Sequence, residues 1–170
     1  MHPYHHPLFV QFIVYFNKNQ DYFECHEVLE EYWKSQEAFS KNHPLTAFIL
    51  LSTGLYHWRR NNFTGAFRTL DNALNRFRSI SSSDQEYLEE VDLCKLIKLV
   101  EQAKASIETN QPFKSFPLPV SPELSALADQ QARSMELLPK NSDAVIYKHM
   151  LRDRSDILKK REEKKKARYY

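Results

Sequence analysis

Residues 55–74 read LYHWRRNNFTGAFRTLDNAL, and this stretch decides the fold. After the Asn61-Asn62 pair, apolar side chains recur three and four positions apart, which is the spacing of one face of an α-helix. Before the pair, the sequence from Pro44 to Arg60 is apolar on almost every side, so we expect a central helix there. Two helices joined by an asparagine turn predict a tight helical hairpin.

A similar pattern of residues occurs near the N-terminus. Aromatic, small and aliphatic residues recur at the same spacing 41 positions apart. The two sets are Tyr22, Cys25, Leu29 and Tyr32, and Phe63, Ala66, Leu70 and Ala73. The pattern is typical of tetratricopeptide-type repeats, but two units fall short of the roughly three that a solenoid needs. Because any tight hairpin favours the same spacing, a repeat and an ordinary hairpin both stay open.

The composition restricts the fold further. The chain has 170 residues, of which 42% are hydrophobic and 27% charged, as in an ordinary globular protein. Only two glycines occur, too few for the glycine-rich phosphate loops of Rossmann and P-loop enzymes. We therefore predict an all-α fold, an antiparallel helical bundle with tetratricopeptide-like hairpins near the N-terminus.

The cysteines and the apolar segments of the sequence predict a cytoplasmic protein. Cys25 and Cys94 lie in apolar-periodic stretches, so we expect both to be buried, reduced thiols. The apolar run 47–58 is too short to cross a membrane, and the first residues lack the features of a secretory signal. The N-terminal histidines could bind metal in vitro without functional meaning; they are His2, His5 and His6.

Four prolines between residues 109 and 122 divide the chain into two predicted parts. Residues 1–108 should form a helical core that carries the HExxE motif, with a last helix from about residue 85 to Glu108. Residues 109–170 should begin as an extended segment, because closely spaced prolines exclude a regular helix. The expected anchors of this segment are Phe113, Phe116 and Leu118. Helices over about 122–138 and from about 142 should follow and pack on the core.

The end of the chain is basic. Residues 159–168 (KKREEKKKAR) hold seven Lys or Arg and two Glu, a local charge of +5, so the remainder of the chain carries −3. Clustered basic residues can bind nucleic acid, and this tail is the only candidate for that role. Because Glu162 and Glu163 interrupt the run, we favour a solvated, frayed helix end.

A helix over about 22–37 carries the chemical motif. Asp21 is a good N-cap for it, and Glu24 is placed as in a capping box. The spacing of His26, Glu30 and Trp33 puts their side chains on one face of the helix. A separate acidic stripe is predicted for Glu24, Glu27 and Glu31.

Two segments of the chain resemble the bacterial and archaeal family called domain of unknown function 309. The first joins Phe16-Asn17 to the run YFECHEVLEEYW over residues 22–33, and the second is LYHWRRNNFTGA over residues 55–66. Family members usually have Gly-Asn where this chain has Asn61-Asn62. The likeness covers about residues 8–78, and residues from about 85 onward are similar to longer, Bacillus-type members. It implies a compact all-helical domain, and the family has been labelled a predicted metal-dependent hydrolase.

The His26-Glu27-x-x-Glu30 segment is similar to the zinc-peptidase helix, with glutamate in place of the second histidine. Zinc or manganese would need a third ligand, and the best donor is His57 on the predicted central helix. We expect His26, Glu30 and His57 to converge, because a short connection makes their helices antiparallel neighbours. In a hydrolase, Glu27 or Glu30 would be the general base.

Three interpretations of this cluster remain open: a structural polar cluster, a pocket for a small ligand or protein partner, and a catalytic metal centre. The residues of the predicted pocket are His26, Glu30, Trp33, Thr53, His57 and Arg60. We favour a ligand- or partner-binding module, with the metal-dependent hydrolase as the alternative, because the motif supplies too few assured metal ligands. The sequence alone assures no cofactor, substrate or oligomeric state.

Overall fold

The computed structural model describes residues 2–37, 39–80, 86, 89–151 and 161–166. The regular structure of these residues is helical, which confirms the all-α class. The elements are η1 (Pro3–His5), α1 (Pro7–Asn17), α2 (Tyr22–Lys34), α3 (Pro44–Arg59), α4 (Phe63–Arg78), α5 (Leu93–Glu108), α6 (Pro122–Ala132), α7 (Asp143–Ile146) and α8 (Lys148–Leu151). Residues 161–166 are also helical. Within the described ranges, no helix is both long and apolar enough to cross a membrane.

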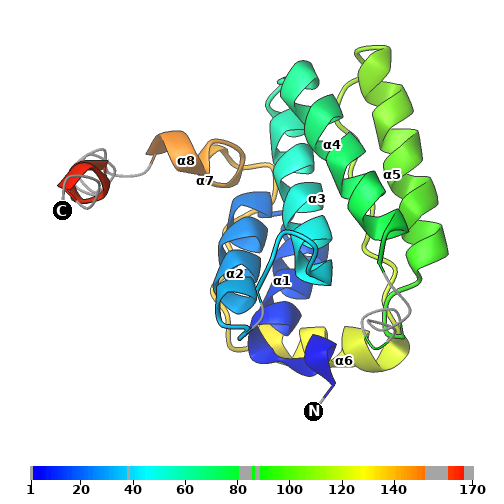
Figure 1. Ribbon diagram of the computed structural model, residues 1–170, viewed down its shortest axis with the longest axis vertical. Helices are drawn as coiled ribbons and strands as arrows, with labels where there is room; N and C mark the ends of the chain where they lie inside the picture. The colour runs from blue at the N-terminus through cyan, green and yellow to red at the C-terminus, as the bar shows by residue number, and fades with distance from the viewer. Residues whose placement is uncertain (1, 38, 81–85, 87–88, 152–160, 167–170) are drawn as a thin grey trace.

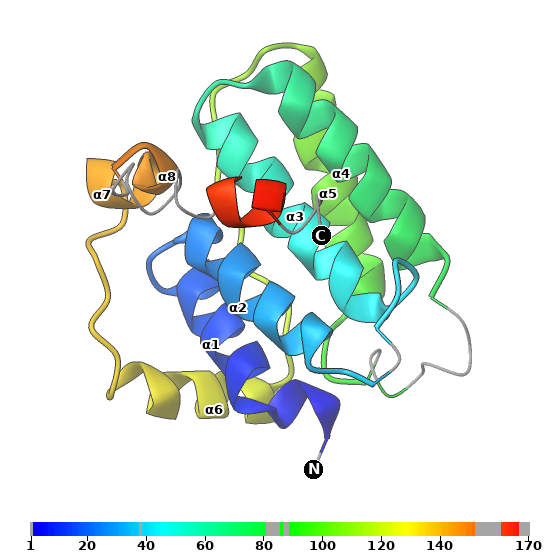
Figure 2. The ribbon, with the colours of Figure 1, turned by 60° about the vertical axis from the view of Figure 1, so that its left-hand side comes forward.

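Successive helices from α1 to α5 pack side by side, with α3 between α2 and α4 (Figures 1 and 2). α6 returns to pack against α1. The buried side chains of these helices form one continuous apolar core. α7 and α8 lie apart from the other helices, beside the end of the α2–α3 pair (Figure 1).

The α3–α4 hairpin forms where the sequence predicts it. Asn61 has a φ of 62°, a left-handed conformation that asparagine tolerates better than most residues. Gly54 allows the two helices to approach closely, because a Cβ added there would lie 2.5 Å from the Leu70 Cδ2 atom. Ala66 is fully buried in the core, as expected of a small residue at a helix contact.

Three helices begin at a His-Pro pair, a use of histidine that sequence analysis did not anticipate. His2, His6 and His43 each precede a proline in the first turn of a helix. The Nδ1 atom of each histidine accepts the backbone N–H two residues later, at 3.1, 3.1 and 3.2 Å. Proline has no N–H, so this is the first donor of each helix that needs a partner. These histidines are therefore helix caps.

The proline-rich segment has no regular helix between Gln111 and Pro119 and packs along the helices. Trp58 Nε1 donates to the Gln111 carbonyl at 3.0 Å, and the Asn17 side chain accepts the Leu118 N–H at 2.8 Å. The Phe113 ring lies edge-on to the Trp58 ring, with centroids 5.2 Å apart. This segment therefore contacts the ends of α1 and α3.

The structure corrects several predicted boundaries. α5 begins at Leu93, not near residue 85, because Val91 pairs with Val120 in an isolated β-bridge and Asp92 caps the helix. α2 ends at Lys34 and α6 ends at Ala132, both earlier than expected, and the helix from residue 143 is interrupted at Tyr147. Cys94 is exposed, so the prediction that it is buried was wrong, whereas Cys25 is buried. Most of the first residues of the helix predicted from about residue 85 lie outside the described residues, as do residues 159, 160, 167 and 168 of the basic tail.

Candidate functional site

His26 and its neighbouring glutamates form one compact group on α2. The His26 Nδ1 atom lies 3.5 Å from Glu27 Oε1 and 3.6 Å from Glu30 Oε2. One ligating atom from each of these three side chains lies within 4.8 Å of the other two. All three side chains are partly exposed, so the group is open to solvent.

Glu30 is also paired with a lysine on the same helix. Its Oε1 atom lies 2.5 Å from Lys34 Nζ. This hydrogen bond to Lys34 lowers the pKa of Glu30, and the nearby His26 and Lys164 lower it further. A metal ion at Glu30 would therefore compete with the Lys34 ammonium for the same carboxylate.

His57 does not belong to the His26 group. Its Nδ1 atom lies 3.3 Å from the side-chain amide of Asn62, the residue that caps α4. Burial lowers the pKa of His57, and the positive charge of Arg60 lowers it further. Because His57 lies in the last turn of α3, its ring faces the α3–α4 turn. The structure thus brings His26 and Glu30 together but leaves His57 outside their group.

The other predicted pocket residues have separate local partners. Trp33 Nε1 donates to the Ser40 carbonyl at 3.0 Å, and Thr53 Oγ1 donates to the Ile49 carbonyl at 3.0 Å. The Arg60 guanidinium lies 5.2 Å from the centre of the Tyr56 ring. These contacts hold α2, α3 and the following turns in place, and they do not bring the three side chains onto the His26–Glu30 pair.

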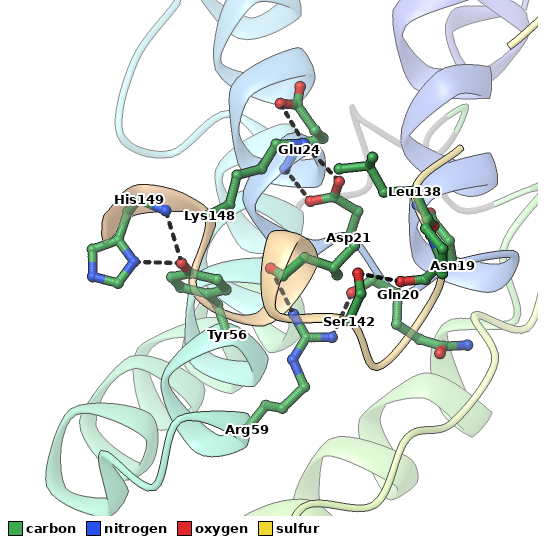
Figure 3. A network of polar contacts seen from close by, with 12 residues as sticks. Asn19, Gln20, Asp21, Glu24, Tyr56, Arg59, Leu138, Ser142, Lys148 and His149 are labelled. Atoms are coloured by element: carbon green, nitrogen blue, oxygen red, sulfur yellow. Dashed lines mark hydrogen bonds and ion pairs between the residues drawn. The ribbon is translucent and has the colours of Figure 1, made fainter. Parts of the chain in front are cut away.

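A second cluster of charges lies where α2 begins and α3 ends. We call Asp21, Glu24, Tyr56 and Arg59 the junction site (Figure 3). Asp21 is only 1% exposed, and its Oδ1 atom caps α2 by accepting the Glu24 N–H at 3.2 Å. The predicted cap is therefore present. The Glu24 carboxylate instead pairs with a lysine from the far end of the chain.

That lysine is Lys148, on α8. Its Nζ atom lies 2.8 Å from Asp21 Oδ2 and 3.0 Å from Glu24 Oε1 (Figure 3). Burial alone would lower the pKa of Lys148, but the hydrogen bonds to Asp21 and Glu24 outweigh this and raise it above its ordinary value. The site therefore holds Lys148 as a charged ammonium.

Arg59 binds main-chain carbonyls from two distant segments. Its Nη1 atom donates to the Gln20 carbonyl at 2.6 Å, and its Nη2 atom donates to the Val145 carbonyl at 3.4 Å. The guanidinium also lies over the Tyr22 ring, 4.8 Å from its centre. Such a planar group suits simultaneous contact with carbonyls and an aromatic face.

Tyr56 completes the junction site through its hydroxyl group. The oxygen lies 2.5 Å from His149 Nδ1 and accepts the His149 backbone N–H at 3.3 Å (Figure 3). The tautomer of the His149 ring decides whether the hydroxyl donates to Nδ1 or accepts from it. Burial lowers the pKa of His149, and the charges of Arg60 and His57 lower it further.

Sequence analysis missed the junction site. Asp21 was predicted only as a helix cap, and Arg59 and Lys148 were not singled out. Arg59 lies 86 positions from its partner Val145, and Asp21 lies 127 positions from its partner Lys148. The available signal was local: an arginine ends an otherwise apolar helix, where a charged group needs a partner.

Comparisons with known proteins identify the family. A profile described as Domain of unknown function (DUF309) matches residues 9–69. A protein of Bacillus subtilis (strain 168) titled "Uncharacterized protein YpuF" is 33% identical over 162 residues, covering 91% of each chain. The chain belongs to the DUF309 family. No solved structure matches it. The profile spans the part of this DUF309 protein that holds Asp21, His26, Glu30, Tyr56 and Arg59.

Proposed function

We propose that this DUF309 protein is a helical binding module that takes up a basic segment of a protein partner along α2. We use the name acidic face for the carboxylates that lie along this helix and at its N-cap: Asp21, Glu24, Glu27, Glu30 and Glu31. The observation that carries the proposal is the ammonium of Lys148, which lies 2.8 and 3.0 Å from the two carboxylates at one end of the face. The face already binds a cationic side chain from a distant polypeptide segment.

The charge distribution supports the same partner chemistry. The five carboxylates lie within residues 21–31, and the chain outside the basic tail carries a net charge of −3. At the other end of the face, Lys164 is close enough to lower the pKa of Glu30 in addition to Lys34 and His26. Complementary charge orients a partner and speeds its association. A basic segment is therefore the partner that this face favours.

Binding of a fluorescent lysine-rich peptide to the full chain tests the proposal. Neutralising Glu27, Glu30 and Glu31 to Gln should weaken binding about tenfold, since each lost charge contact at a partly exposed site contributes up to about 1 kcal/mol. The matched control neutralises three carboxylates on other helices, Glu101, Glu108 and Glu123. Equal weakening in both triple variants would contradict the proposal, because attraction would then depend only on net charge.

A second candidate function, metal binding at His26, Glu27 and Glu30, is favoured by one observation. Ligands about 2.0–2.2 Å from a tetrahedral zinc ion lie roughly 3.3–3.6 Å from one another. The His26 Nδ1 atom is 3.5 and 3.6 Å from the two carboxylate oxygens. These three residues would hold the ion, which would supply the polarised water of the hydrolase alternative.

Metal titration must separate this group from a second one. Ligating atoms of His2, His5 and Glu90 also lie within 4.8 Å of one another. In the His2 ring, however, Nδ1 accepts the Tyr4 N–H, so the ring proton is on Nε2 and blocks metal binding there. Zinc uptake by the full chain that is lost in His26→Ala and retained in His5→Ala would support the second candidate. Uptake that is unchanged in His26→Ala would contradict it.

A further inference from the structure

Residues 138–150, which we call the clasp, occupy the junction site from within the same chain. Main-chain groups of the clasp are held at two points: Asn19 Nδ2 donates to the Leu138 carbonyl at 3.1 Å, and Arg59 donates to the Val145 carbonyl. Two side chains of the clasp are also held: Lys148 by the carboxylates of Asp21 and Glu24, and His149 by the hydroxyl group of Tyr56. The clasp is therefore bound as a peptide ligand would be, through both its backbone and selected side chains (Figure 3).

Two clasp residues carry the specificity of this contact. Val145 is fully buried on α7, and Lys148 follows three positions later, at the start of α8. Val145 thus supplies an apolar anchor beside Arg59, and Lys148 reaches the carboxylates of Asp21 and Glu24. An apolar residue and a lysine at this spacing therefore fill the junction site.

Other clasp side chains contribute little to the core. The structure has four exposed large hydrophobic residues among those it describes, and three belong to the clasp: Leu138, Tyr147 and Met150, exposed by 40%, 39% and 64%. α7 is only four residues long, too short to be stable without neighbours. Because apolar burial is the main source of stability, the clasp is held weakly compared with α1–α5.

Departure of the clasp would leave unfavourable charges at the junction. Asp21 is almost completely buried and would lose its cation, and Arg59 would lose one of its two carbonyl partners. In the open site these groups would be paired only with water, so a replacement of the same chemistry would restore their contacts.

We propose that the clasp is an intrinsic ligand of the junction site, and that the external ligand is a segment of another protein whose apolar residue and lysine, three positions apart, replace Val145 and Lys148. This rests on the binding role proposed above and adds the sequence pattern of the partner and its competition with the clasp. The partner binds only when the clasp is released.

The experiment measures binding of a labelled peptide with the sequence of residues 138–150, LPKNSDAVIYKHM, to the full-length protein. In the unaltered protein the clasp competes with the peptide. The apparent Kd is therefore the intrinsic Kd divided by the fraction of molecules in which the clasp is released. Lys148→Ala in the protein should therefore lower the Kd about tenfold or more. Lys140→Ala, which changes an exposed lysine of the same segment, should leave the Kd unchanged.

Two further measurements make the outcome decisive. A peptide carrying Lys148→Glu should bind the Lys148→Ala protein at least about tenfold more weakly than the natural peptide. Trypsin should cleave after Lys140 faster in the Lys148→Ala protein, while its circular dichroism spectrum stays helical. A peptide that binds the unaltered and Lys148→Ala proteins equally, or binds neither, would overturn the proposal. If the unaltered protein does not bind the lysine-rich peptide while the Lys148→Ala protein binds the clasp peptide, only the role of Glu27, Glu30 and Glu31 is contradicted.

Discussion

The ammonium of Lys148 lies 2.8 Å from the carboxylate of Asp21, although 127 positions separate the two residues along the chain. Asp21 caps α2 with its other oxygen, so one buried carboxylate serves both the helix and the clasp. This pairing connects the stability of the clasp to the charge at the start of α2.

Replacing Lys148 should release the clasp without unfolding the helices. We expect Lys148→Ala to change the global free energy of unfolding by less than about 1 kcal/mol, because Asp21 becomes hydrated once the clasp leaves. Backbone amides of residues 143–149 should exchange hydrogen about tenfold faster, whereas those of α3 should not change. Urea titration and hydrogen exchange measure the two effects. A loss of about 3–5 kcal/mol in the global free energy of unfolding would instead show that Lys148 and Asp21 form a buried ion pair on which the whole fold depends.

Acidification should open the clasp through His149. The pKa of His149 is lower in the folded protein than its ordinary value of 6.5, because of burial and the charges of Arg60 and His57. The unfolded or released state then binds more protons, so stability is complete above 6.5 and is lost as the pH falls below it. Hydrogen exchange of residues 143–149 should accelerate as the pH falls below 6.5.

The groups around His149 allow a matched control for this pH effect. They are Tyr56 and His57 on α3, Arg60 at the C-cap of α3, and Lys148 on the clasp itself. His149→Gln keeps a side-chain acceptor but removes the titrating ring, so it should reduce the pH dependence of exchange. His57→Gln leaves the Tyr56–His149 hydrogen bond in place, so it should preserve most of the pH dependence of exchange. Identical pH profiles for the His149→Gln and unaltered proteins would show that another group controls the opening.

Close packing of α3 against α4 makes Gly54 sensitive to substitution. The Cβ of Gly54→Ala would lie 2.5 Å from Leu70 Cδ2, so one of the two helices or the leucine must move. We expect a loss of about 1–3 kcal/mol in urea titration, as for other overpacked cores. Leu70→Ala removes the clash, so the cost of Gly54→Ala in that background should be smaller. Additive losses would show that the clash is not with Leu70.

The helical hairpin could be predicted from the sequence because its signals are local. Apolar spacing places α3 and α4, and Asn61-Asn62 provides the turn. The start of α5 could not be predicted in the same way, because it depends on the bridge between Val91 and Val120, residues distant in sequence.

The candidate site was predicted less well for the same reason. His26 and Glu30 are one helical turn apart, so their proximity follows from α2 alone. His57 was expected to join them, but the orientation of the last turn of α3 directs its ring toward Asn62. The contacts of Lys148 and Arg59 depend on how the C-terminal segment returns to the start of α2, which periodicity does not encode.

The most direct test of the binding function is the effect of Glu24 on clasp-peptide binding. Glu24 is partly exposed and contacts Lys148 without capping a helix, so its charge can be changed with little effect on α2. The affinity is measured by fluorescence anisotropy in full-length protein that carries Lys148→Ala. Adding Glu24→Lys to this protein should lower its affinity for the peptide LPKNSDAVIYKHM about tenfold or more. The peptide carrying Lys148→Glu should bind the Glu24→Lys protein with the affinity restored. Equal affinity of both peptides for both proteins would contradict recognition of a basic segment at this site.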